Sequence, residues 1–214
     1  MGPVAKERLK SPRVRLFVAL DLPAAVREGL ASWQREALSD PALRAMRPEA
    51  LHVTLCFLGY HPERSVDRIA EILAAVESRP VELALAAEPV PIPGGRPRLY
   101  AIGAPSEAAV ELQAELAEAL ATARLYEPEK RDFWPHLTVA RVRSERLRPA
   151  PGRRRGRGRP RRVESPPAPL RNELTSPFGA VRLALYRSNL KPEGAEYVSL
   201  AGVDLPSPRG DQKR

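Results

Sequence analysis

Two short stretches of the chain each carry a histidine followed two residues later by a threonine. One reads Leu-His-Val-Thr-Leu around His52, and the other reads Pro-His-Leu-Thr-Val around His136. Such short apolar runs beside turn-forming residues predict β-strands, in which His52 shares a face with Thr54, and His136 with Thr138. Two facing imidazoles can act as proton donor and proton acceptor while the hydroxyls hold phosphate oxygens, a combination suited to phosphodiester cleavage.

Other chemistries fit these residues less well. Two histidines without a third ligand from a cysteine or a His-Glu helix motif make a poor metal site, so we expect neither a metal nor a cofactor. The absence of a Gly-x-Ser-x-Gly elbow argues against a serine nucleophile. The bland alternative is that the histidines are structural groups and the threonines are β-formers. Alternation also places Cys56 on the face of His52, with Phe57 behind, but a buried cysteine behaves as a small hydrophobe.

The rest of the chain predicts an ordered series of strands and helices. In chain order these are a strand at 15–20, a helix at 24–38, the His52 strand, a turn at 59–62, a helix at 65–76, a strand at 81–87, a Pro- and Gly-rich loop at 89–97, a strand at 98–102, a helix at 106–123, the His136 strand, and strands at 178–186 and 197–203. The predicted helices have apolar residues at the helical period, and the predicted strands alternate.

The second half of this series repeats the first. The segment Arg-Leu-Tyr-Ala-Ile that begins at Arg98 resembles the segment Arg-Leu-Phe-Val-Ala that begins at Arg15. The distance from Arg15 to His52 is 37 residues, and the distance from Arg98 to His136 is 38 residues. A duplicated strand-helix-strand unit, packed with pseudo-twofold symmetry, would bring both histidines to one groove.

Length and composition are those of one globular unit. The chain has 214 residues, 43% of them hydrophobic, and its single cysteine excludes an intramolecular disulfide. No apolar run is long enough to span a membrane, and Lys6 stands where a myristoylation signal has Ser or Thr. We therefore expect a cytoplasmic monomer that does not bind membranes.

The net charge of +9 is concentrated in one segment. Residues 141–171 hold 12 of the 35 basic residues and 2 of the 26 acidic residues, which leaves 23 basic and 24 acidic residues elsewhere. We divide the chain into a flexible leader (1–13), one bilobal domain (14–205) with an Arg- and Pro-rich mobile insert (144–169), and a disordered tail (206–214). The insert either binds an RNA backbone through its arginines or is a low-complexity segment without that role.

The paired motifs and their flanking residues resemble the 2H phosphoesterase superfamily. The two histidines lie 84 residues apart, the first motif follows Arg-Leu-Phe-Val-Ala-Leu-Asp-Leu-Pro and continues as Phe57-Leu58-Gly59, and the second continues as Ala140-Arg141. Within that superfamily the chain is similar to the RNA 2′,3′-cyclic phosphodiesterases, also called 2′-5′ RNA ligases. The similarity extends from residue 15 to about residue 205, apart from the insert, and includes a Leu-Tyr-Arg-Ser segment near the C-terminus.

The resemblance implies an α+β fold of two lobes, each with an antiparallel sheet, around a central cleft that holds the active site. It implies hydrolysis of an RNA 2′,3′-cyclic phosphate to a terminal 2′-phosphate. His52 would be the proton donor and His136 the proton acceptor, while Thr54, Thr138 and Arg141 would bind the phosphate. Strict alternation from His136 directs Arg141 to the opposite face, so the strand must bulge or end near residue 140, or the long side chain must reach round the edge.

Aromatic residues and the identity of the substrate leave further alternatives. Tyr100 is a candidate for stacking on a base in the cleft, whereas we expect Phe17 in the core. The expected partner is RNA with a 2′,3′-cyclic phosphate end, for which tRNA fragments are candidates. Ligation of tRNA halves through a 2′-5′ bond, cleavage of a small cyclic nucleotide and a non-enzymatic RNA-binding module stay open, because the motifs handle phosphate and say little about what is attached to it.

Overall fold

The computed structural model describes residues 12–145, 158–191 and 194–208. Its strands are β1 (Arg13–Asp21), β2 (Leu43–Ala45), β3 (His52–Pro62), β4 (Glu82–Leu83), β5 (Pro89–Ile92), β6 (Leu99–Gly103), β7 (His136–Val142), β8 (Phe178–Gly179), β9 (Arg182–Lys191) and β10 (Gly194–Asp204). Its helices are α1 (Ala24–Ala37), α2 (Val66–Ala75), α3 (Glu107–Thr122) and α4 (Asn172–Thr175), with 3₁₀ turns at Pro48–Ala50 and Glu63–Ser65. The expectation of an α+β fold with antiparallel strands is confirmed.

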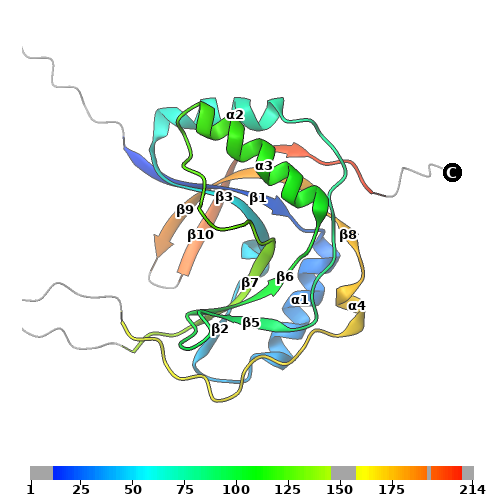
Figure 1. The fold of residues 1–214 in the computed structure, drawn as a ribbon. Coiled ribbons are helices and arrows are strands. Elements are labelled where there is room, and N and C mark those ends of the chain that lie inside the picture. Colours follow the sequence, from blue (N-terminus) through cyan, green and yellow to red (C-terminus); the bar gives the residue numbers. More distant parts are fainter. Residues whose placement is uncertain (1–11, 146–157, 192–193, 209–214) are drawn as a thin grey trace, which may run out of the picture.

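The strands form two groups that meet at the junction of β3 with β7. Within the described residues, eight strands form one sheet in the order β10-β9-β1-β3-β7-β6-β5, with β2 also pairing β7. One antiparallel residue pair, Val53 with Leu137, joins β3 to β7. The strands expected as one sheet in each lobe are therefore two arms of a continuous path, with β1, β3, β9 and β10 in one arm and β2, β5, β6 and β7 in the other (Figure 1).

The helices cover this sheet with the apolar faces that their sequence period creates. Figure 1 shows α2 and α3 next to each other over the first arm and α1 beside the second arm. Helix α3 begins at a capping residue, since the Ser106 hydroxyl accepts a hydrogen bond from the Ala109 amide. The largest fully buried side chains of the core are Leu16, Leu20, Leu22, Leu30, Leu51, Ile69, Leu73, Leu83, Ile102, Leu112, Leu116 and Leu120.

Some predicted loops are strands in the structure. The prediction of a turn at 59–62 is wrong, because residues 60–62 pair with the start of β1 and so extend β3 to its end at Pro62. Gly59, with φ of +77°, lies beside an irregularity in this pairing, which bends the strand without reversing it. Part of the predicted Pro- and Gly-rich loop forms β5, which pairs with β6.

The Arg- and Pro-rich insert has a defined course where it is described. Residues 146–157 of the insert lie outside the described residues, and residues 144–145 and 158–169 are described. The buried Asp40 carboxylate accepts hydrogen bonds from the amides of Glu164 and Ser165, at 2.7 and 2.9 Å. Bonds to backbone amides, the one from Ser165 first, lower the pKa of Asp40 and tie the returning chain to the body of the protein.

The two ends of the chain fall mostly outside the description. The predicted leader at 1–13 overlaps residues 1–11, and the predicted tail at 206–214 overlaps residues 209–214, neither of which the structure describes. Arg13 belongs to β1, so the domain begins slightly before the expected residue.

Candidate active site

The two histidine–threonine motifs meet where β3 joins β7. Their middle residues pair in antiparallel register, which directs His52 toward Thr138 and Thr54 toward His136. These four side chains and Arg141 line one cavity of about 540 Å³. The structure therefore brings together the proton-transfer and phosphate-binding groups that the sequence predicts.

A bulge in β7 turns Arg141 toward the cavity. The pairing of β7 with β6 passes from Ala140 directly to Thr138, so Val139 is skipped. The extra residue reverses the alternation beyond it, and Arg141 then lies on the face of His136. The sequence pattern allows a bulge, a strand end near residue 140 or a side chain that reaches round the edge. In the structure, a bulge brings Arg141 to the cleft.

Hydrogen bonds from helix α1 and from the residue after β2 hold this bulge in place. The Val139 carbonyl oxygen accepts a hydrogen bond of 2.7 Å from the side-chain amide of Gln34 in α1 and one of 3.0 Å from the backbone amide of Met46. Gln34 is a buried polar residue on an otherwise apolar helix face. The hydrogen bond explains why a polar residue lies at this position. Without Gln34, the buried Val139 carbonyl oxygen would lose one of its two donors.

Strand β3 carries the equivalent bulge. Its pairing with β1 passes from Cys56 directly to Thr54, so Leu55 is skipped. Cys56 is consequently buried and Phe57 is 42% exposed on the cavity. The predicted faces of Cys56 and Phe57 are wrong, because simple alternation ignores the bulge. Burial raises the pKa of the Cys56 thiol to about 12, as befits an inert core residue.

One wall of the cavity is positively charged. Arg44 in β2 pairs directly with Arg141 in β7, and both line the cavity. Burial, followed by the charges of Arg141, Arg143 and Arg47, lowers the pKa of Arg44. Like charges on opposed strands repel each other, so this wall favours an anionic ligand that offsets them.

His52 is surrounded by aromatic rings. The Phe17 ring is stacked on it at a centroid distance of 4.9 Å, the Tyr197 ring contacts it edge-on at 5.2 Å, and the Tyr186 ring lies parallel at 6.0 Å. Phe17 is buried, as expected, but it also forms the support of the imidazole. These contacts hold the ring of His52 in one orientation.

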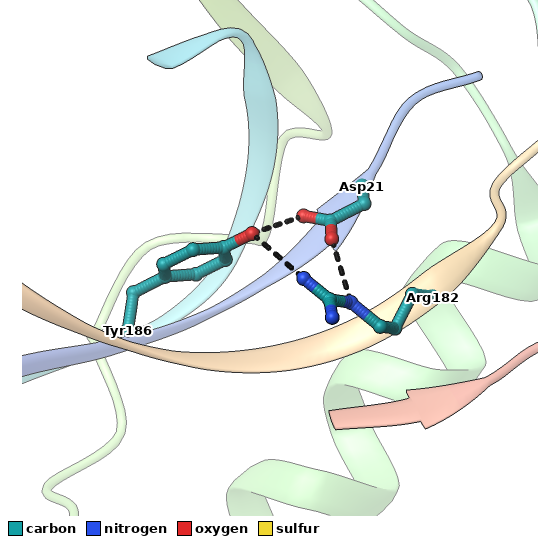
Figure 2. Close-up of polar contacts among 3 residues, drawn as sticks. All are labelled: Asp21, Arg182 and Tyr186. Atoms are coloured by element: carbon teal, nitrogen blue, oxygen red, sulfur yellow. Dashed lines mark hydrogen bonds and ion pairs between the residues drawn. The ribbon is translucent and has the colours of Figure 1, made fainter. Parts of the chain in front are cut away.

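Asp21 is the cross-strand neighbour of His52 and is itself held by two side chains. The pairing of β1 with β3 places Asp21 opposite His52. Figure 2 shows the Asp21 carboxylate between Tyr186 and Arg182: the Tyr186 hydroxyl donates to Oδ1 at 2.7 Å, and Arg182 Nε donates to Oδ2 at 2.9 Å. The Asp21 side chain is thus buried and fixed in position beside a histidine of the candidate site.

Charge and burial act on His52 in opposite directions. Burial lowers the pKa of His52 to about 4, and the positive charges of Arg141 and His136 contribute in the same direction. The negative charge of Asp21 acts to raise this pKa. An anion bound in the cavity adds to the effect of Asp21 and favours the imidazolium form.

His136 has a different neighbour in the equivalent place. The pairing of β6 with β7 sets Gly103 opposite His136, so no carboxylate is present there. The missing side chain leaves space for the Trp134 indole, which would lie 3.4 Å from a Cβ on Gly103 and stacks on His136 at 4.4 Å. The His136 Nδ1–H donates to the Trp134 carbonyl oxygen at 2.7 Å, which leaves Nε2 as the acceptor.

The two histidines therefore differ chemically although their motifs are equivalent. Asp21 favours the protonated form of His52, which suits a proton donor. The carbonyl bond of His136 selects a tautomer whose Nε2 can take a proton. Such a pair can protonate a leaving group on one side of a phosphorus atom and deprotonate a nucleophile on the other.

A second cavity, also of about 540 Å³, adjoins the first on the His136 side. It shares Thr54, Phe57 and His136 with the first cavity. Trp134 and Tyr126 add aromatic surface to its wall. This cavity can receive an aromatic or sugar-like group next to the candidate proton acceptor.

The structure does not bring Tyr100 to the cleft. Its side chain is 4% exposed and lines a different cavity together with Pro91, Arg159 and Pro160. The bulge at Val139 shifts the register of its strand pair, so its place on the face cannot be read from the period alone. Tyr100 is therefore not placed to stack on a base in the cleft. The aromatic residue beside a catalytic candidate is Trp134, which stacks on His136.

Sequence reasoning missed residues that the pairing of strands brings to the site. Asp21 follows Phe17 at an even spacing, so alternation indicates that they share a face, but it does not reveal that His52 lies opposite. Tyr186 and Tyr197 come from the C-terminal hairpin, whose neighbour β1 is distant in sequence. Trp134 could have been noticed from its place two residues before His136.

Two negative observations concern the described residues alone. In the described ranges, no three or more His, Cys, Asp or Glu side chains gather as metal ligands. None of the helices that the structure describes is long and apolar enough to cross a bilayer.

Comparison with known sequences identifies relatives of the chain. A sequence model of the 2′-5′ RNA ligase superfamily matches residues 22–153. The RNA 2′,3′-cyclic phosphodiesterase of Thermus thermophilus is 31% identical over 209 residues, which cover 94% of this chain and 93% of the relative. The protein of the same name from Archaeoglobus fulgidus is 35% identical over 134 residues, which cover 61% of this chain and 73% of the relative.

Solved structures share the fold. E. coli LigT complexed with 3′-AMP superimposes with a TM-score of 0.69 at 22% identity, over 91% of this chain and 99% of LigT. The Thermus thermophilus protein TT0787 superimposes with a TM-score of 0.68 at 29% identity, over 92% of this chain and 99% of that protein. The overall fold is thus common to these proteins and this chain.

Proposed function

Because this chain belongs to the 2′-5′ RNA ligase superfamily, we propose that it hydrolyses RNA 2′,3′-cyclic phosphate ends to 2′-phosphomonoesters by general acid–base catalysis with two histidines. Relatives named RNA 2′,3′-cyclic phosphodiesterase match nearly its whole length. The observation that carries the proposal is the cavity at the β3–β7 junction, which His52, Thr54, His136, Thr138 and Arg141 line together.

His136 acts as the proton acceptor in this proposal. Its Nδ1–H is engaged by the Trp134 carbonyl oxygen, so Nε2 takes a proton from the attacking water. The water oxygen bonds to phosphorus as the bond from phosphorus to the ribose 3′ oxygen breaks. The product keeps the phosphate on the 2′ oxygen.

His52 acts as the proton donor to the departing 3′ oxygen. Burial lowers its pKa to about 4, but the Asp21 carboxylate and the negative charge of a bound cyclic phosphate both favour its protonated form. Proton donation then leaves His52 neutral, which is the form that its buried surroundings favour. The stacked Phe17 ring keeps the imidazole directed at the leaving group.

The phosphate is held by the threonines and Arg141. The Thr54 and Thr138 hydroxyls donate hydrogen bonds to the non-bridging oxygens, and Arg141 offsets the negative charge that develops in the transition state. The paired imidazoles supply both proton transfers, so we propose that the reaction needs no metal and no cofactor. We also propose that the chain acts on RNA ends as a cytoplasmic monomer, with tRNA fragments as candidate substrates.

The second cavity favours one alternative reaction. A nucleoside with a free 5′-hydroxyl could lie there, next to His136, and replace water as the nucleophile. The same proton transfers would then join two RNA ends through a 2′-5′ bond. Hydrolysis remains our main proposal, because water reaches the same position without a second RNA.

The proposal is tested by product analysis on an oligonucleotide that ends in a 2′,3′-cyclic phosphate. We expect a 2′-phosphate product and no 3′-phosphate. His52→Ala and His136→Ala should each reduce kcat/KM roughly 100- to 10,000-fold. His61→Ala is the control, because His61 does not line the cavity and binds the Leu58 carbonyl. RNA binding without turnover by the wild type would support the binding-module alternative instead.

A further inference from the structure

Beyond the threonines, equivalent positions of the two motifs carry different kinds of side chain. Counting across the two bulges, Phe57 follows Thr54 at the same distance at which Arg141 follows Thr138. Both side chains line the cavity. The second motif therefore supplies a cation to the cavity from its own strand, and the first motif supplies an exposed aromatic ring.

A cation is nevertheless held at this place by the neighbouring strand. The Arg15 guanidinium carbon lies 4.5 Å from the centroid of the Phe57 ring. Arg15 Nη1 also donates a hydrogen bond of 3.2 Å to the Ser188 hydroxyl in β9. Two strands thus orient Arg15 on the rim of the cavity, and the stacked ring leaves the edge of the planar guanidinium available to an acceptor.

The surroundings of Arg15 suit a phosphate group. In the part of the chain that the structure describes, no carboxylate forms an ion pair with Arg15. Phe57 and Tyr60 beside it are exposed aromatic residues, at 42% and 54%. An oriented arginine among exposed aromatic rings is the combination that single-stranded RNA binds, with phosphate on the cation and bases on the rings.

The place of Arg15 relative to His52 indicates which phosphate it would meet. Arg15, Phe17 and Asp21 lie on the same face of β1 at even spacing, and Phe17 stacks on His52. Arg15 is therefore on the side of the candidate proton donor, where the ribose of the leaving 3′ oxygen lies in the proposed reaction. The 5′ side of that ribose carries the next phosphodiester of an RNA chain.

From this geometry we infer that Arg15, supported by Phe57 and Ser188, binds the phosphodiester on the 5′ side of the terminal nucleotide. The inference rests on the proposed function and names its substrate class, which is an oligonucleotide with a cyclic phosphate end in preference to a nucleoside cyclic phosphate. Arg15 is a specificity residue and takes no part in bond making or breaking.

The test compares two substrates that differ only in this phosphodiester: a dinucleotide ending in a 2′,3′-cyclic phosphate and the corresponding nucleoside 2′,3′-cyclic phosphate. Arg15→Gln should reduce kcat/KM for the dinucleotide about tenfold and leave the nucleoside value unchanged. The slope of log kcat/KM against log salt for the dinucleotide should also become shallower by about 0.7. Arg68→Gln removes a charge from the exposed surface of α2 and serves as the control.

Equal losses on both substrates, or no loss on either, would overturn the inference. Failure of the proposed function is a separate result, in which the wild type turns over neither substrate. The affinity of the wild type and of Arg15→Gln for the dinucleotide ending in a 2′-phosphate then decides the role of Arg15. A weaker affinity of the variant for this dinucleotide, with equal affinity for the nucleoside 2′-phosphate, supports the inference, and equal affinities for both reject it.

Discussion

His52 and His136 occupy equivalent positions of the two motifs, but different residues lie next to them. Asp21 stands opposite His52, and Gly103 stands opposite His136. A carboxylate beside an imidazole stabilises its cation, whereas the space left by a glycine admits the Trp134 indole, and the carbonyl of that residue selects one tautomer of His136. The proposed division of labour between the histidines thus rests on what each strand pair places next to the ring.

Replacement of Asp21 tests this assignment at His52. Because the Asp21 charge raises the pKa of His52 against the effect of burial, Asp21→Asn should lower it further below about 4. A smaller fraction of His52 is then protonated at every higher pH, so kcat/KM at neutral pH should fall about tenfold for each pKa unit lost, and its acidic limb should move to lower pH.

The pKa is measured by NMR titration of the free protein and compared with the pH profile of kcat/KM. Asp204→Asn is the matched control, because Asp204 is an exposed carboxylate on β10 of the same arm. A rise of the His52 pKa in Asp21→Asn, or an unchanged pH profile, would contradict the role given to Asp21.

At the scale of the elements, the bulges in β3 and β7 shape the candidate site. Both motif strands bulge immediately after the threonine, and the bulge in β7 returns Arg141 to the cavity. Gln34 in α1 donates to the carbonyl oxygen of the bulged Val139, so this helix helps to hold the bulge that directs Arg141, the proposed phosphate-binding residue, to the cavity. The bulges thus decide which side chains of the two strands face the cavity.

Gln34→Leu removes that donor with little change of volume. The buried Val139 carbonyl then keeps only the Met46 amide, so we expect a loss of about 1–3 kcal/mol in the free energy of unfolding. We also expect kcat/KM to fall about tenfold as Arg141 loses its orientation, a cost comparable to one charged hydrogen bond. Urea denaturation and steady-state kinetics measure the two effects, with Glu36→Gln on the exposed face of α1 as control. Undiminished kcat/KM in folded Gln34→Leu would show that the bulge does not depend on this bond.

The sequence predicts the motifs, the repeat and most elements, because these depend on local periods and spacing. The superfamily match confirms the resemblance. The sequence pattern does not predict the bulges at Leu55 and Val139, because these bulges depend on how strands that are distant in sequence pair. For this reason the strand faces predicted for Cys56 and Phe57 are wrong. For the same reason the sequence pattern does not reveal Asp21 and Tyr186 as residues of the candidate site. The sequence thus indicates where the two histidines lie in their strands, but it does not indicate how their surroundings differ.

At the scale of the whole molecule, the candidate active site lies at the junction of the two arms. Val53 and Leu137 form the one residue pair between β3 and β7 in the described part of the chain, and both side chains are fully buried. The separation of the two histidines therefore depends on the packing behind this pair. Substrate binding on one face and core packing on the other are linked through the same two strands.

A pair of core substitutions separates stability from site geometry. Leu137 and Leu73 are both fully buried, but Leu73 lies in α2, which packs mainly against α3, β9 and β10. Each replacement by alanine should cost about 2–5 kcal/mol in the free energy of unfolding. Only Leu137→Ala should also lower kcat/KM when both variants are assayed under conditions in which they are fully folded. Equal kcat/KM in the two variants would show that the junction does not control the site.

A substrate whose leaving atom needs no proton tests the paired-histidine mechanism most directly. In a 2′,3′-cyclic phosphate with sulfur in place of the 3′ oxygen, the thiolate departs unprotonated, so the proton donor becomes dispensable while the proton acceptor is still required. We predict that His52→Ala hydrolyses this substrate at a rate close to that of the wild type, and that His136→Ala stays slow on both substrates. Rescue of His136→Ala in place of His52→Ala, or of neither variant, would contradict the mechanism.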